Sequence, residues 1–128
     1  MPLTNAGRNF FAAATLAEGP PTPFNNANAH IGVGDSSTAF NVNQTDLQAA
    51  VNKVRVGMDP GFPTLNANAM AFQSTFGTAV ANFTWAEWAT FNASSAGVML
   101  NRKVESNGTK QSGQIWIFGS ILTIGIGS

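Results

Sequence analysis

Apolar residues near the amino terminus recur every three or four positions, as they do along one face of an amphipathic helix. This spacing predicts a short helix within Leu3–Ala17, and Thr4 is placed to cap its first turn. The helix cannot continue past Glu18, because the Gly-Pro-Pro-Thr-Pro sequence that follows lacks amide donors and favours extended backbone. We therefore expect residues 1–28 to form a helix and an extended arm, attached to a body that spans residues 29–128.

From residue 29 onward, short runs with apolar side chains at every second position alternate with clusters of Gly, Asn, Asp and Ser. This period of two is typical of half-buried β-strands that end in turns. Between the strands we expect one or two helical turns over Thr45–Val51 and a tight hairpin at Asn107-Gly108. Many short strands joined in this way predict a mainly β fold, either an antiparallel β-sandwich or a jelly-roll-like barrel. The predicted strands span residues 29–33, 53–58, 66–76, 83–91, 98–104 and 114–126.

Two of these strands carry large apolar residues on both faces. In residues 83–91, strict alternation places Trp85 and Trp88 on opposite faces. In residues 114–126, a row of isoleucines faces one way while Trp116 and Phe118 face the other. A strand with two apolar faces needs cover on both sides, so we expect the last strand in the centre of a sandwich or buried between subunits.

Charged residues are few in this chain of 128 residues. Six Lys and Arg balance six Asp and Glu, and charged residues make up 9% of the sequence, against roughly 25% in an ordinary soluble domain. Uncharged surfaces let molecules approach and associate. Two long stretches, Pro60–Ala86 and Gln111–Ser128, carry no charge, and we expect protein partners to cover the fold there.

The composition also excludes several classes of partner and site. Two short basic pairs, at positions 53/55 and 102/103, are too small a footprint for nucleic acid. With no cysteine, one histidine and no carboxylates at calcium-loop spacing, we expect no metal site. Gly32-Val33-Gly34 lacks the third glycine of a dinucleotide-binding turn, so we expect no cofactor. No signal peptide is apparent and the uncharged tail is expected to be a strand, so we expect no membrane partner.

Glu87 is the best candidate for a catalytic carboxylate, because Trp85 and Trp88 flank it and an apolar setting raises a carboxyl pKa. A general acid works with a second carboxylate or an activated water, and the sequence places no such partner beside it. We therefore expect a structural ion pair with Arg102 or Lys103 on the following strand, and favour Glu87 with Arg102. No catalytic residue is assigned, and the chain is not expected to be an enzyme.

The histidine and the tryptophans are also expected to be structural. His30 lies near the start of a predicted strand, where a hydrogen bond to the backbone is expected in place of an acid–base role. Trp85, Trp88 and Trp116 are expected in the core, because large aromatics dominate the cores of small β domains. If they were exposed instead, they would form a platform on which a sugar ring could stack.

Six motifs lie along the chain: Leu3-Thr4-Asn5-Ala6-Gly7, Ala12-Ala13-Ala14, Ala29-His30-Ile31-Gly32-Val33-Gly34-Asp35, Gln44-Thr45-Asp46-Leu47, Asn82-Phe83-Thr84-Trp85-Ala86-Glu87-Trp88-Ala89-Thr90-Phe91-Asn92 and Leu100-Asn101-Arg102. Together they resemble small virion proteins of tailed bacteriophages. The sequence is similar, more loosely, to the amino-terminal attachment domains of tail-collar fibre proteins. For capsid cement or decoration proteins, the resemblance implies β-sandwich homotrimers that sit between major capsid subunits and bridge them with terminal arms.

Chain length favours a capsid role within this resemblance. A fibre-attachment domain needs a shaft after it, and this sequence stops at Ser128, so we expect a stand-alone capsid cement protein located in the virion. Its expected partners are the major capsid protein or other virion proteins, with Phe10, Phe11 and Phe24 as apolar anchors of the arm. Two alternatives stay open: a tail or baseplate component of the virion, and a glycan-binding module for host recognition.

Overall fold

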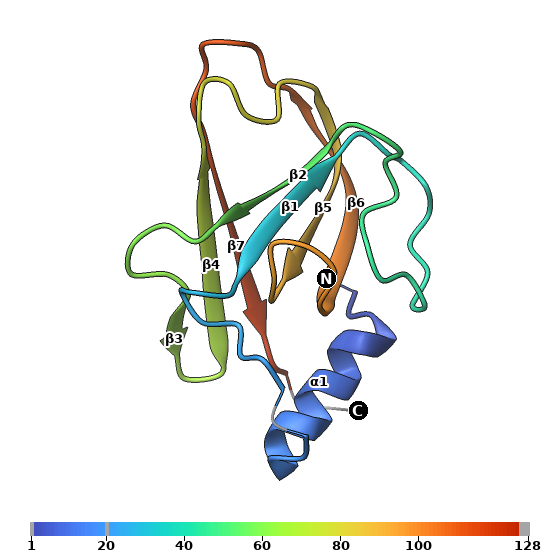
Figure 1. The fold of residues 1–128 in the computed structure, drawn as a ribbon, viewed down its shortest axis with the longest axis vertical. Helices are drawn as coiled ribbons and strands as arrows, with labels where there is room; N and C mark the ends of the chain where they lie inside the picture. The colour runs from blue at the N-terminus through green and yellow to red at the C-terminus, as the bar shows by residue number, and fades with distance from the viewer. Residues whose placement is uncertain (1, 20, 126–128) are drawn as a thin grey trace.

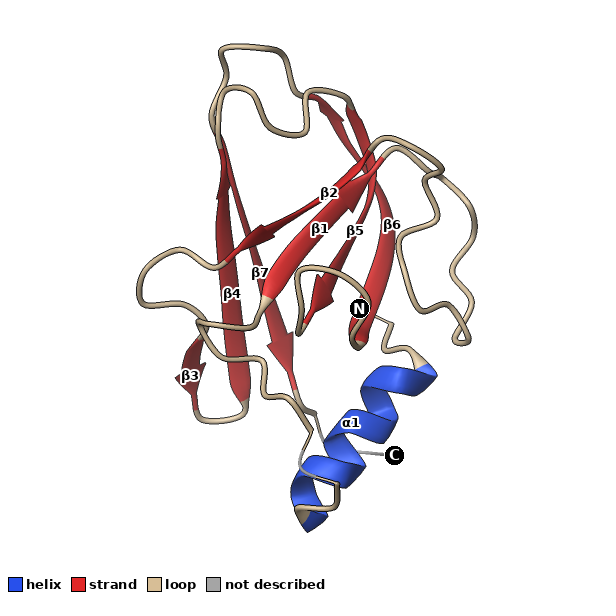
Figure 2. Cartoon of the chain, viewed as in Figure 1, coloured by secondary structure: helices blue, strands red, loops and turns tan. Residues whose placement is uncertain are grey.

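The computed structural model describes residues 2–19 and 21–125 and shows a mainly β fold (Figure 1). Two antiparallel sheets face each other, with strand orders β2-β1-β5-β6 and β3-β4-β7, and one helix lies at the end of the pair (Figure 2). The sheets do not close into a barrel, so the predicted antiparallel β-sandwich is confirmed. The elements are α1 (Asn5–Leu16), β1 (His30–Gly34), β2 (Lys53–Gly57), β3 (Thr64–Asn66), β4 (Ala69–Phe76), β5 (Thr84–Phe91), β6 (Met99–Thr109) and β7 (Trp116–Thr123).

Helix α1 forms where the spacing predicts it and docks closely on β6. The Thr4 side chain accepts a hydrogen bond from the Gly7 amide at 2.9 Å, which makes Thr4 the N-cap as predicted. Thr4 is fully buried and its hydroxyl donates to the Met99 carbonyl. Gly7 lies against the backbone of Leu100, so a Cβ at position 7 would come within 2.2 Å of that carbonyl oxygen. The amino-terminal segment thus packs on the sandwich.

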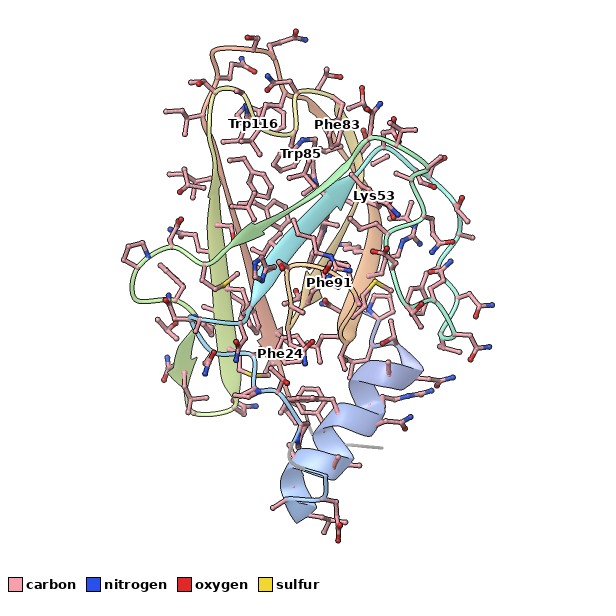
Figure 3. All side chains as sticks on the ribbon, viewed as in Figure 1. Phe24, Lys53, Phe83, Trp85, Phe91 and Trp116 are labelled. Atoms are coloured by element: carbon pink, nitrogen blue, oxygen red, sulfur yellow. The ribbon has the colours of Figure 1, made fainter. Side chains whose placement is uncertain are left out.

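The core between the two sheets is built around tryptophans (Figure 3). Trp85 and Trp88 are 1% and 3% exposed, which agrees with the core interpretation. The Trp85 ring makes edge contacts with Phe76 and Trp116, with centroids 4.7 Å and 5.0 Å apart. Such aromatic contacts add to the stabilisation from burial of apolar area. The buried residues of this core are Ala29, Ile31, Val33, Phe72, Phe76, Ala81, Trp85, Trp88, Leu100 and Leu122.

The pairing of β5 with β6 shifts register, and this corrects two predictions. Trp85 lies opposite Gly108 whereas Glu87 lies opposite Val104. The alternation of faces breaks there, so Trp85 and Trp88 both enter the core and not opposite faces as predicted. The predicted hairpin at Asn107-Gly108 is wrong, because both residues lie within β6 and the positive φ of Gly108 serves the irregular pairing. The turn to β7 comes later, where the Gln114 amide donates to the Gln111 carbonyl.

The connection between β1 and β2, residues 35–52, covers the outer face of the four-stranded sheet. The helical turns predicted for Thr45–Val51 do not form. Leu47 is instead buried with Ala89, Phe91 and Met99 in a second, smaller apolar cluster. We refer to residues 35–52 as the covering segment.

The other predicted strands form with shifted ends. The strand predicted over residues 66–76 begins at Ala69, because the chain turns at Ala67, which has a φ of 54°, and pairs β3 with β4. The last strand ends at Thr123 within the described residues. It lies at the edge of its sheet beside β4, so of the two predicted alternatives the central position is wrong.

The close contact between α1 and β6 yields a test of the helix position. Replacing Gly7 by Ala is expected to lower the free energy of unfolding by about 1–2 kcal/mol, because the added methyl group meets the Leu100 carbonyl and overpacking outweighs the gain in helix propensity. Urea denaturation followed by tryptophan fluorescence measures this loss. Asn9→Ala, at an exposed helix position, is the control and is expected to be neutral or slightly stabilising. Equal stability of the two variants would show that the helix does not dock as described.

Candidate functional site

Glu87 and Arg102 form the buried ion pair that the sequence predicts. Glu87 comes from β5 and Arg102 from β6, and Arg102 Nε lies 2.7 Å from Glu87 Oε1. Both side chains are 0% exposed. Lys103, the other basic residue considered for this pairing, lies 3.7 Å from Glu105 on the surface.

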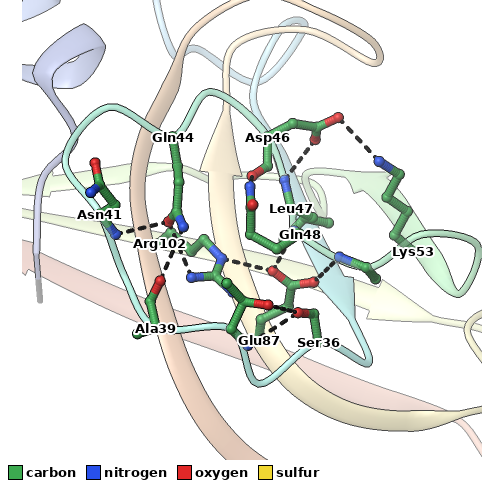
Figure 4. A network of polar contacts seen from close by, with 12 residues as sticks. Ser36, Ala39, Asn41, Gln44, Asp46, Leu47, Gln48, Lys53, Glu87 and Arg102 are labelled. Atoms are coloured by element: carbon green, nitrogen blue, oxygen red, sulfur yellow. Dashed lines mark hydrogen bonds and ion pairs between the residues drawn. The ribbon is translucent and has the colours of Figure 1, made fainter.

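The Glu87 carboxylate also holds the covering segment in place (Figure 4). Its two oxygens accept hydrogen bonds from the backbone amides of Gln48 and Ala49, each at 2.8 Å. In the predicted helical turns the Ala49 amide would bond the Thr45 carbonyl, so its hydrogen bond to Glu87 competes with those turns. Gly34 lies so close that a Cβ there would meet Glu87 Oε2 at 2.4 Å. Gly34 of β1 and the amides of the covering segment therefore enclose the carboxylate on two sides.

Arg102 joins the same network through Gln44. Its Nη1 donates to Gln44 Oε1 at 3.2 Å, and Gln44 Nε2 donates to the Ala39 carbonyl at 3.0 Å. The Gln44 side chain also accepts from the Asn41 amide at 3.1 Å. A carboxylate fixed in this way has no approach for a substrate, so its geometry fits a structural clamp and not a general acid.

A second polar cluster surrounds Arg55 of β2. Its guanidinium donates to the carbonyls of Ala93 and Ala96, each at 2.9 Å, and its Cζ lies 3.5 Å above the ring centroid of Phe91. It also donates to Asp46 Oδ1 at 3.2 Å. These contacts join the covering segment to the turn after β5, and no local pattern around Arg55 in the sequence indicates them.

The pKa of Asp46 reflects this setting. Partial burial raises the pKa, but the Leu47 amide, the Arg55 hydrogen bond and the charges of Lys53 and Arg55 lower it by more, so the pKa lies below its ordinary value. A cavity of about 220 Å³ lies between these residues and Ser94–Ala96. Its charged groups already bind one another, so the cavity offers no free ligand set.

The remaining candidate residues have structural contacts. His30 Nδ1 lies 2.8 Å from the Asn28 carbonyl, the backbone hydrogen bond expected for it. Of the three tryptophans only Trp116 is partly exposed, so no three-tryptophan sugar platform lies on the described surface. Within residues 2–19 and 21–125 no group of three His, Asp or Glu side chains could hold a metal ion, and no helix is long and apolar enough to cross a membrane.

The predicted arm anchors pack on one another and on their own chain. The ring of Phe10 makes edge contacts with those of Phe24 and Phe11, with centroids 4.9 Å and 6.0 Å apart. Phe11 and Phe24 also contact the main core. All three rings stay half-buried, so part of each is still available to a neighbour.

A surface with few charges lies on the outer face of the three-stranded sheet. The fold brings the two charge-free stretches together there, because β3 and β4 come from one and β7 from the other. Ile117 and Ile121 are 65% and 63% exposed on this face, although isoleucine is usually buried. We call this surface the isoleucine face. By alternation with the buried side chains, it comprises Ala69, Ala71, Gln73, Thr75, Ile117, Gly119, Ile121 and Thr123.

A groove of about 430 Å³ crosses the isoleucine face, with Phe62, Ala71, Gly119 and Ile121 among its lining residues. One carboxylate meets this face, and it is already engaged: Asp59 accepts hydrogen bonds from Gln73 at 3.0 Å and Thr75 at 2.9 Å. A hollowed surface with exposed isoleucines and a single engaged carboxylate is typical of a protein interface. It is the strongest candidate for a functional site.

The ion pair makes a prediction about stability. Replacing Glu87 by Gln should lower the free energy of unfolding by about 3 kcal/mol, because Arg102 then stays buried with an uncompensated charge. Urea denaturation measures the loss. The double variant Glu87→Gln/Arg102→Met should recover part of it, since no buried charge remains. A double variant less stable than Glu87→Gln would contradict this role of the pair.

Asp46 gives a prediction about pH. Its pKa is lower in the folded than in the unfolded chain, so its contribution is present above the unfolded pKa and is lost as pH falls through the folded pKa. The wild type should therefore lose more thermal stability between about pH 7 and about pH 3 than Asp46→Asn does. Melting temperatures followed across this range by circular dichroism provide the comparison. Parallel curves for the two proteins would contradict the assignment.

No protein-family model matches the chain, and no curated protein sequence matches it. The function proposed for the isoleucine face accordingly rests on the residues, their geometry and the resemblance given by the sequence motifs.

Proposed function

We propose that the protein is a non-enzymatic structural protein of a bacteriophage virion, and that it acts as a capsid cement protein. The single observation that carries this proposal is the isoleucine face, with Ile117 and Ile121 exposed on a sheet whose charge-free strands come from separate parts of the sequence. In this proposal the face lies against the major capsid protein or another virion protein. The virion role itself comes from the motifs that resemble small phage virion proteins.

The two sheets differ in a way that supports binding through one of them. The covering segment closes the outer face of the four-stranded sheet, where Leu47 and Ala49 are buried. Within the described residues no segment closes the outer face of the three-stranded sheet in the same way, and two isoleucines stay exposed there. An apolar partner surface would remove this area from water and stabilise the complex.

The proposed mechanism is linkage between binding and assembly. A subunit that binds the assembled shell and not its dissociated parts stabilises the shell by mass action. The half-buried rings of Phe10, Phe11 and Phe24 form a second apolar area at the helix end of the molecule, where the proposed arm contact with a neighbouring subunit would lie.

The groove on the isoleucine face offers a direct test of binding. Ala71→Glu introduces a charge among its lining residues on β4, and it is expected to weaken binding to capsids that lack the protein by at least tenfold. Co-sedimentation with purified capsids measures this binding. Val51→Glu, at a position 84% exposed on the covering segment, is the matched control and should bind as the wild type does. Equal binding by both variants would contradict a role of this face.

Copy number in purified virions tests the capsid assignment. A cement protein is expected at a copy number comparable with that of the major capsid protein. A few copies confined to the tail would overturn the assignment and point to the tail or baseplate alternative. Quantitative mass spectrometry of intact virions and of separated tails gives this ratio.

A further inference from the structure

Strand β7 has an unpaired edge with unusual chemistry. It lies at the end of the order β3-β4-β7, and no described strand pairs with its side away from β4. Its eight residues include no charge and no proline. Natural proteins usually protect such edges with charges, prolines or short strands, because unpaired backbone groups attract another strand.

The other sheet edges of this molecule carry that protection. Strand β2 has Lys53 and Arg55, and β6 has Lys103 and Glu105. Strand β3 has three residues. Among the described edge strands, β7 is therefore the one that is long and carries neither a charge nor a proline.

The sequence around β7 is close to a hydrophobic palindrome centred on Gly119. In an antiparallel pairing of two copies about this residue, Ile117 of one copy lies opposite Ile121 of the other, and Trp116 lies opposite Leu122. The isoleucines then form a continuous row on the outer side, while Trp116 and Leu122 keep their inward orientation. β-Branched pairs of this kind stabilise neighbouring strands.

Glycine at position 119 is not required by the isolated chain. A Cβ there would have Phe72 O at 3.6 Å as its nearest neighbour, an ordinary contact distance. Residue 119 is also not among the residues with positive φ. In the two-fold pairing, however, the two residues at position 119 face each other between four isoleucines, where the absence of a side chain leaves room for them.

We propose that β7 pairs antiparallel with β7 of a second copy of this chain, about a two-fold axis at Gly119, and joins the two three-stranded sheets. Both edges are uncharged and the chain has no net charge, so no electrostatic repulsion opposes the approach. Such an interface uses the same patch on both copies and closes as a dimer. One strand edge buries less than the roughly 800 Å² per partner of a standard interface, so we expect a dissociation constant in the micromolar range. The proposal concerns the purified chain and does not rest on the virion assignment.

Analytical ultracentrifugation of the full chain tests the dimer. The wild type is expected to change from monomer to dimer with rising concentration, and Ile117→Lys/Ile121→Lys is expected to weaken association at least tenfold, because like charges then lie directly opposite. Val51→Lys, at another exposed apolar position, should leave association unchanged. A wild type that stays monomeric at about 1 mM, forms trimers only, or dimerises equally well with both lysines would overturn the proposal.

The register can be tested by charge exchange. In Ile117→Lys/Ile121→Glu each lysine lies opposite a glutamate of the second copy, so this variant should associate at least tenfold more tightly than the double-lysine variant. Positions 117 and 121 are strongly exposed, so both variants are expected to fold, which circular dichroism checks. Equal dissociation constants for the two variants would overturn the proposed register.

A cross-linking measurement gives an independent readout. The chain has no cysteine, so Gly119→Cys introduces a single thiol at the proposed axis, where two Cβ atoms come within reach of a disulfide. Under mild oxidation this variant is expected to form a covalent dimer at least tenfold faster than Val51→Cys. Equal rates would show that position 119 is not at a two-fold contact.

Discussion

The buried carboxylate of Glu87 is the constraint on which the arrangement of this molecule depends. It neutralises Arg102 and binds the amides of Gln48 and Ala49, so it fixes the covering segment over one sheet. Leu47 then closes a second apolar cluster with Phe91 and Met99. With one sheet covered by its own chain, the molecule has two different outer faces, and the isoleucine face is the exposed apolar one.

This asymmetry connects the fold with the proposed role. Most of the few charged residues lie in the Glu87–Arg102 ion pair, around Arg55 and on the edge strands β2 and β6. The strands that come from the charge-free stretches form one sheet together. The two charge-free stretches of the sequence therefore lie together on one surface of the molecule. A groove beside Gly119 and Ile121 gives that surface a shape that a partner side chain can enter.

Much of the fold could be predicted from the sequence, since periodicity and local chemistry determine it. The helix cap at Thr4, most strand positions and the Glu87–Arg102 pair belong to this class. Three features could not, because they depend on contacts between distant residues. The register shift opposite Gly108 reorients Trp85. The Glu87 carboxylate binds the Ala49 amide that the expected helical turns would have used. The contacts of Arg55 involve segments some forty residues apart. The two apolar faces of the last strand indicated either a central position or a contact between subunits. The structure excludes the central position, and the contact between subunits stays a prediction.

We propose that the three-stranded sheet makes the main contact with protein partners, with the smaller contact of Phe10, Phe11 and Phe24 at the helix end beside it. Amide hydrogen exchange measured by mass spectrometry on the dilute chain and on the same chain in its assembled particle tests this most directly. Strong added protection is expected across β4 and β7 on assembly, with little change in the covering segment, which Glu87 already holds. Unchanged exchange in β7 together with new protection confined to residues 35–52 would contradict it.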